Sequence, residues 1–111
     1  MEMSTRRLKV YISAPYTKGD VAQNVRRAID VADALLLKGH YPYIPHLTHF
    51  WHFASPHSWE TWLEIDLAFL PCCDAILRLD GDSKGADTEV EVAAKLKMPV
   101  YSSLGEVPDA I

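Results

Sequence analysis

Two carboxylates lie at positions of predicted helices where a solvated acid is not expected. In the helix predicted over residues 58–70, apolar side chains recur at helical spacing, and Asp66 falls in the middle of their stripe. In the helix predicted over residues 86–96, Glu89 shares the inward face, whereas Glu91 points away from it. An ionisable group on a core-facing stripe costs free energy unless it is paired or serves a function. Both carboxylates are therefore candidates for a functional site.

Glu89 is expected within about the first turn of its helix, where the positive end of the helix dipole favours the ionised carboxylate. A carboxylate kept charged in a partly apolar site is what nucleophilic catalysis by an acid requires. The structural alternative is a helix-capping glutamate, but capping alone would not explain a place on the inward stripe. For Asp66 the alternative is a local cap or ion pair at the edge of the sheet.

Ser83 precedes Glu89 by six residues, in a turn that contains Gly85 and opens the predicted helix. Hydroxyl and backbone donors at such a place suit a phosphate or a sugar hydroxyl. The alternative is a serine that only caps the helix, which is the commoner role of serine at this position.

The elements that must position these residues alternate between strands and helices. Strands are predicted over residues 8–14, 41–44, 74–79 and 98–101, and helices over residues 21–38, 58–70 and 86–96, with a short closing helix in the tail. Asp20 and Gln23 resemble a capping box at the start of the first helix. Residues 45–58 form a long aromatic segment without a clear period, which we interpret as a loop.

This order predicts one α/β domain over residues 1–111. We expect a flavodoxin/Rossmann-like parallel sheet of four to five strands with helices on both faces. Such folds bind ligands at the carboxyl ends of their strands. In this chain the loops at those ends are APYTKGD, PHLTHFWHFASPHS and DGDSKGA. The last contains glycines but matches neither GxGxxG nor a Walker loop, which disfavours a dinucleotide enzyme or an NTPase.

The amino-acid composition further restricts the class of protein and the partners that it can have. The 111 residues are 49% hydrophobic and 23% charged, as in a soluble globular protein, and the formal net charge of −4 without a basic stretch argues against a nucleic acid polymer as partner. No apolar run is long enough to span a membrane, and the first ten residues carry no signal-peptide core. The adjacent Cys72 and Cys73 are interpreted as reduced thiols, so a cytoplasmic location is expected.

Three segments together resemble the nucleoside 2-deoxyribosyltransferase superfamily, which includes deoxynucleoside 5′-monophosphate N-glycosidases and short uncharacterised relatives. The segments are VYISAPY in the first strand, WLEIDLAFLPCCDAI across the second helix, and SKGADTEVEVAAKLKMPV near the end. The resemblance covers most of the chain, and the middle loop aligns least well. It implies an enzyme that cleaves the N-glycosidic bond of a nucleoside or nucleotide and uses no metal or cofactor.

The resemblance also implies roles for individual residues. Glu89 matches the nucleophile that attacks the anomeric carbon, Asp66 matches the acid beside the nucleobase, and Tyr11 matches the tyrosine that orients the glutamate. Ser83 stands where the monophosphate glycosidases have a phosphate-binding serine, whereas Pro15 replaces another such serine and offers neither hydroxyl nor N–H. The requirement for a 5′-phosphate therefore stays open.

The remaining expectations concern the surroundings of these residues. Substrate-binding residues are expected to be Ser83, Gly85, Ala14, Tyr16 and His46. Tyr16, Phe50 and Trp51 are candidates for a base-stacking surface. His46, His49, His52 and His57 lie close in sequence, but no cysteine or carboxylate completes a zinc set inside their loop.

Three alternatives remain at the level of function: transfer of the glycosyl group to a second base, its hydrolysis, and a non-catalytic nucleotide-binding domain. The resemblance further implies a homodimer or higher homo-oligomer, because superfamily members complete their sites across a subunit interface.

Overall fold

The four strands of the chain form one parallel sheet. A computed structural model describes residues 6–110. Outside the described residues lie Ile111 and residues 1–5. The latter are half of the ten-residue segment in which no signal-peptide core is expected. The strands are β1 (Lys9–Ser13), β2 (Tyr41–Tyr43), β3 (Ala75–Arg78) and β4 (Val100–Tyr101), in the spatial order β2-β1-β3-β4. This flavodoxin-like order confirms the predicted α/β fold with a parallel sheet.

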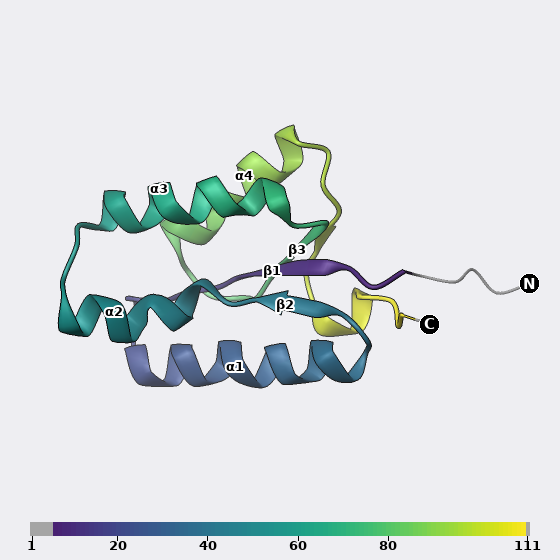
Figure 1. Cartoon of the computed structure of the whole chain (residues 1–111), viewed down its shortest axis with the longest axis horizontal. Coiled ribbons are helices and arrows are strands. Elements are labelled where there is room, and N and C mark those ends of the chain that lie inside the picture. The colour runs from purple at the N-terminus through teal and green to yellow at the C-terminus, as the bar shows by residue number, and fades with distance from the viewer. Residues whose placement is uncertain (1–5, 111) are drawn as a thin grey trace, which may run out of the picture.

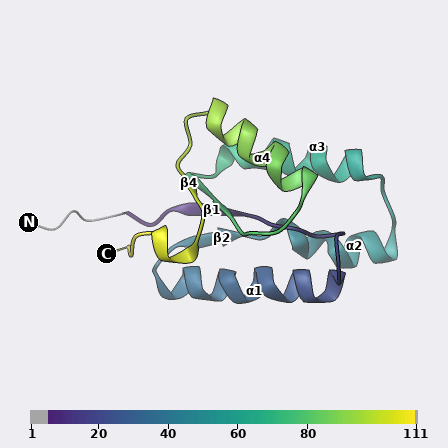
Figure 2. The same cartoon turned by 180° about the vertical axis from the view of Figure 1, so that it is seen from behind.

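Helices cover both faces of the sheet, as predicted (Figure 1). Helix α1 (Val21–Leu37) lies on one face, and α3 (Trp59–Phe69) and α4 (Lys84–Lys95) lie on the other. Figure 2 shows the same layers from behind, with the short 3₁₀ turn η3 (Leu104–Glu106) beside α1. The closing helix expected in the tail is this single turn.

The side chains of β1 point alternately to the two faces of the sheet and so belong to two different hydrophobic clusters. Val10 and Ile12 point into a cluster with α1, which includes the buried Ala28, Ala32 and Leu35. Tyr11 points to the opposite face, where it packs with Leu70, Ile76 and Ala93. The alternation follows from the period of two along a strand. It places every second side chain of β1 under α3 and α4.

Side-chain caps fix where the three long helices begin. Asp20, Ser58 and Ser83 each accept a hydrogen bond from the backbone N–H three residues later. The cap at Ser83 means that α4 begins at Lys84 and not at residue 86 as predicted. Leu96, the last residue of the predicted helix, is the C-cap of α4 and is 48% exposed.

The aromatic segment predicted as a loop is largely helical. It contains a 3₁₀ turn, η1 (Pro45–Thr48), followed by α2 (His49–Ala54), and only residues 55–58 connect α2 to α3. The α2 helix has no side-chain cap and no buried residue, so it carries neither of the usual sequence signals of a helix. Among the described residues, no helix is long and apolar enough to cross a membrane.

Candidate active site

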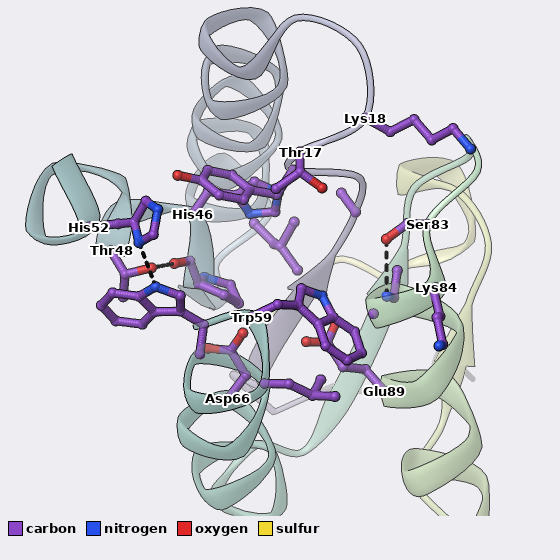
Figure 3. Close-up of a pocket in the computed structure, with 18 of the residues that line it drawn as sticks. Thr17, Lys18, His46, Thr48, His52, Trp59, Asp66, Ser83, Lys84 and Glu89 are labelled. Atoms are coloured by element: carbon purple, nitrogen blue, oxygen red, sulfur yellow. Dashed lines mark hydrogen bonds between the residues drawn. The ribbon is translucent and has the colours of Figure 1, made fainter. Parts of the chain in front are cut away.

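A cleft of about 420 Å³ opens at the carboxyl ends of β1, β2 and β3. Its walls come from the loop after β1, from η1, from α2 and α3, and from the start of α4 (Figure 3). The crevice at this end of a doubly wound sheet is where such folds bind ligands. Seven of the eight predicted site residues line it: Glu89, Asp66, Ser83, Gly85, Ala14, Tyr16 and His46.

Glu89 lies on the floor of the cleft and is 6% exposed. The hydroxyl of Tyr11 donates a hydrogen bond to its Oε2 at 2.7 Å, and the hydroxyl of Ser13 donates one to its Oε1 at 2.7 Å. Each carboxylate oxygen therefore has its own donor from β1. Two hydroxyl donors hold the carboxylate in one orientation and stabilise its ionised form. Tyr11 itself is completely buried beneath the cleft, where it supports Glu89 without lining the cavity.

Ser13 is a site residue that the sequence analysis missed. It is completely buried and stands two residues after Tyr11, so both side chains leave β1 on the same face. That alternation was available in the sequence as a signal. A serine among the apolar residues of a buried strand requires a hydrogen-bond partner, and Glu89 supplies it.

The position of Glu89 in its helix corrects one expectation. Glu89 lies five positions after Lys84, the first residue of α4, and so belongs to the second turn. The dipole effect fades beyond the first turn, so Tyr11 and Ser13, and not the helix terminus, are its main electrostatic support. Burial raises the pKa of Glu89, while the hydrogen bonds from Ser13 and Tyr11 and the charge of Arg78 oppose that rise.

Asp66 faces the cleft from α3. Burial and the nearby negative charge of Glu89 raise its pKa from 3.8 to about 7. With a pKa of about 7, Asp66 can take up and release a proton near neutral pH, and the negative charge of an ionised Glu89 favours its protonated form. Two carboxyl groups in different environments are the pair that an acid-assisted nucleophilic reaction uses.

His46 lines the cleft from η1 and is 5% exposed. Its Nε2 lies 3.1 Å from the carbonyl oxygen of Pro15, and burial lowers its pKa. The ring of Tyr16 stands edge-on to His46 at 5.9 Å, and the Tyr16 hydroxyl lies 2.6 Å from Nδ1 of His49. These contacts join the loop after β1 to the segment after β2.

Ser83 lines the cleft at the start of α4 (Figure 3), and Gly85, two residues later, lines it as well. The Ser83 hydroxyl accepts a hydrogen bond from the backbone N–H of Ala86 at 3.1 Å, so it is a helix cap, which was the alternative interpretation. Lys18 and Lys84 also line the mouth, and Nζ of Lys18 pairs with Asp82 at 2.7 Å.

The aromatic wall of the cleft contains one of the three expected residues and two others. Tyr16 lines the cleft, but Phe50 is 78% exposed and lies outside it, and Trp51 packs edge-on against Trp62 at 4.8 Å without reaching the cavity. Trp59 and Trp62 line the cleft instead. Phe50 and Trp51 are therefore not part of this cleft, and Trp51 instead lines a shallow hollow beside the end of β2 with Tyr43 and Leu47.

The four clustered histidines form two pairs that contact different aromatic side chains. Nε2 of His46 lies 3.1 Å from the Pro15 carbonyl oxygen and Nδ1 of His49 lies 2.6 Å from the Tyr16 hydroxyl. Nδ1 of His52 accepts hydrogen bonds from the indole of Trp62 at 2.8 Å and from the backbone N–H of His57 at 3.3 Å. In residues 6–110, no group of three or more histidine, cysteine, aspartate or glutamate side chains is placed to hold a metal ion.

Comparisons with known proteins agree with this architecture. Residues 8–103 match the family model described as a domain of unknown function, DUF7768. No curated protein matches the chain significantly. Among solved structures, the chain is similar to the 2-deoxyribosyltransferase of the psychrotolerant bacterium Bacillus psychrosaccharolyticus, with a TM-score of 0.59 and 22% identity over 83% of this chain and 69% of that chain. At this identity the similarity establishes a shared fold.

Proposed function

The chain belongs to the DUF7768 family, and we propose that it cleaves the N-glycosidic bond of a nucleoside or of a nucleoside 5′-monophosphate, as a nucleoside 2-deoxyribosyltransferase-like enzyme. The observation that carries the proposal is the pair of carboxyl groups in the cleft. Glu89 is held by hydrogen bonds from Tyr11 and Ser13, and Asp66 lines the same cleft. The fold shared with a 2-deoxyribosyltransferase supports the same assignment.

Glu89 is the nucleophile of the first step. Its carboxylate attacks the anomeric carbon, and the bond between that carbon and the base nitrogen breaks with its electron pair leaving on the base. Asp66, whose pKa of about 7 leaves part of it protonated at neutral pH, gives its proton to the departing base and so lowers the barrier to departure. The products of this step are a glycosyl ester on Glu89, an ionised Asp66 and a neutral base.

The second step releases the sugar. A water molecule or a nitrogen of a second base attacks the anomeric carbon, transfers its proton to Asp66, and displaces the Glu89 carboxylate. Water gives hydrolysis and a second base gives transfer. Tyr11 and Ser13 are positioning residues in both steps, because they hold the Glu89 carboxylate oxygens while charge leaves and returns.

The monophosphate alternative is favoured by the two lysines at the mouth of the cleft. Lys18 and Lys84 line the cleft with Ser83, and lysines can neutralise a phosphate, although Nζ of Lys84 lies 5.6 Å from the centre of the Trp59 ring. Two observations argue against a 5′-monophosphate as substrate. Lys18 is already paired with Asp82, and the ring of Pro15 packs against Gly81 and provides no donor. We therefore propose the nucleoside as the principal substrate and the 5′-monophosphate as the second candidate.

Self-association is part of the proposal. Helix α2 presents large apolar side chains to solvent, with Phe50 at 78% and Phe53 at 79% exposure, next to Leu47 in η1 at 59%. Exposed apolar groups of this size are typical of a protein–protein interface. We propose a homodimer or higher homo-oligomer that covers them, and sedimentation equilibrium of the wild type and of Phe53→Ser is the measurement. A monomeric wild type contradicts this part of the proposal.

The function is tested by base release. Deoxynucleosides and their 5′-monophosphates are each incubated with and without a second free base, and products are separated by chromatography. Free base supports hydrolysis, a new nucleoside supports transfer, and no product from any substrate leaves the non-catalytic binding domain as the better description.

The matched variants are Glu89→Gln and Glu91→Gln. Both lie on α4, but Glu91 is exposed and outside the cleft. We expect Glu89→Gln to lower the rate by about a thousandfold or more, because the amide cannot form the glycosyl ester. Glu91→Gln is expected to keep the wild-type rate. Wild-type turnover by Glu89→Gln would show that the nucleophile is another group.

A further inference from the structure

Arg78 is a largely buried cation at the carboxyl end of β3. It is the last residue of that strand and pairs with Ser13 of β1 in the parallel sheet. Paired residues of neighbouring strands direct their side chains to the same face of a sheet. The side chain of Arg78, which is 17% exposed, therefore leaves the sheet on the face where Ser13 holds Glu89.

The guanidinium group of Arg78 joins three parts of the chain. It donates hydrogen bonds to the carbonyl oxygen of Leu79, to the carbonyl oxygen of Gly81 at 2.9 Å, and to Oδ1 of Asp87 at 3.0 Å. Leu79 and Gly81 belong to the turn between β3 and α4, and Asp87 lies in the first turn of α4, two residues before Glu89. One side chain thus fixes the start of the helix that carries Glu89.

Polar and charged groups from four other elements surround Glu89. They are Tyr11 and Ser13 from β1, Tyr43 from β2, Asp66 from α3 and Arg78 from β3, and Asp87 on α4 itself bonds Arg78. Arg78 is the positive charge of this set. Asp87 is 67% exposed, so water screens its charge, whereas Arg78 is largely removed from water. The charge of Arg78 therefore acts on Glu89 through the protein.

The electrostatic effect on Glu89 has a definite sign. Burial raises the pKa of Glu89, and the positive charge of Arg78 opposes that rise together with the hydrogen bonds from Ser13 and Tyr11. A nucleophilic carboxylate must be ionised before it attacks, and it becomes an anion again when the sugar leaves it. A fixed cation nearby favours the charged form at both points of the reaction.

We propose that Arg78 is a positioning residue of the reaction, which fixes Glu89 through Asp87 and the turn before α4 and whose positive charge keeps the Glu89 carboxylate ionised. The inference rests on the proposed function for the role of Glu89 as nucleophile. Arg78 is not among the residues that line the cleft, so it acts through Glu89 and not on the substrate.

The first test is the pH dependence of kcat/KM for base release. The acidic limb of this profile falls as Glu89 takes up a proton. In Arg78→Met the cation is lost, so we expect the midpoint of the limb to move to higher pH by about 0.5 or more. Arg78→Lys keeps the charge but not the planar fork, so its midpoint should stay near that of wild type although kcat falls. A purely structural role predicts a lower kcat in both variants and no movement of the limb.

Arg27→Met is the matched control. Arg27 lies on α1 and supports the same turn from the opposite face of the sheet, where it donates to the carbonyl oxygen of Asp80 at 2.8 Å. It does not belong to the groups around Glu89, so its loss should leave the midpoint of the acidic limb unchanged. An acidic limb that stays in place in Arg78→Met, or that moves equally in Arg27→Met, overturns the inference.

A spectroscopic titration separates this inference from the proposed function. Wild type with isotope-labelled glutamate and arginine is titrated with acid, and NMR follows the side-chain carboxyl carbon of Glu89 and Nε of Arg78. We expect the Arg78 signal to change at the pH where Glu89 takes up its proton, and this change should be absent in Glu89→Gln. A change caused by Asp87 instead remains in Glu89→Gln.

The outcome does not depend on turnover or on a variant of Arg78. If no nucleoside is turned over, the proposed function fails, and the titration alone decides whether the charges of Arg78 and Glu89 are coupled. An Arg78 signal that stays constant while Glu89 titrates overturns the inference, even if Arg78→Met does not fold.

Discussion

Replacing Asp66 by asparagine should change how the stability of the protein depends on pH. Asp66 ionises near 3.8 in the unfolded chain and near 7 in the folded protein, where burial and the charge of Glu89 disfavour its anion. At pH values between these two pKa values, Asp66 holds a proton in the folded protein that it has lost in the unfolded chain. The free energy of unfolding therefore falls as pH rises from about 4 to about 7, and it stays low above that range. Asparagine does not titrate and avoids this loss.

The magnitude follows from the rise in pKa. The difference between 3.8 and about 7 corresponds to roughly 4 kcal/mol, at about 1.4 kcal/mol for each tenfold change in the ionisation constant. Asp66 keeps partial contact with water, which screens the charge, so we expect about half of this value. Relative to wild type, Asp66→Asn should gain about 2 kcal/mol between pH 4 and pH 8.

Urea denaturation at the two pH values, followed by tryptophan fluorescence, measures this difference. Trp59 and Trp62 line the cleft with Asp66, so their fluorescence reports on unfolding of the cleft. Glu64→Gln is the control, because Glu64 is exposed on the same helix and its replacement should change stability equally at both pH values. If wild type and Asp66→Asn differ by the same amount at pH 4 and pH 8, the argument that burial holds Asp66 protonated is refuted.

Further variants test other parts of the structure. Tyr11→Phe removes a 2.7 Å hydrogen bond to Glu89, and we expect kcat to fall about 10- to 100-fold with KM little changed; a steady-state assay that finds unchanged kcat would contradict the positioning role. His40 is completely buried and forms hydrogen bonds with the backbone through both ring nitrogens. Replacing it by phenylalanine should lower the free energy of unfolding by about 2–3 kcal/mol, as measured by urea denaturation, and a loss below about 0.5 kcal/mol would show that these bonds do not stabilise the fold. Gly81 has φ +117°, and a Cβ there would lie 2.8 Å from Cγ of Pro15, so Gly81→Ala should lower the melting temperature by the equivalent of about 1–3 kcal/mol; an unchanged melting temperature would show that the turn relaxes freely.

Local features of the chain were predictable because their interactions join residues close in sequence. The caps at Asp20, Ser58 and Ser83 each bond a backbone group three residues away, and the residue types that cap helices are few. The alternation of strands and helices likewise predicted a parallel sheet, since consecutive parallel strands require a crossover. The short helix α2 was missed because it has only six residues and no side-chain cap marks its start.

The sequence by itself determined the α/β alternation and the inward placement of Asp66 and Glu89, because periodicity acts within a few residues, but it placed the start of α4 two residues late and missed α2. Only the tertiary structure decided what those carboxylates meet. Ser13 lies 76 residues from Glu89 along the chain, and only the pairing of β1 with β3 and the packing of α4 bring them within 2.7 Å. The neighbour of Nε2 of His46 is likewise a property of the folded cleft, since no local pattern states that this nitrogen meets the Pro15 carbonyl oxygen. Contacts of this range depend on the whole packing arrangement, which a pattern read along one chain does not contain.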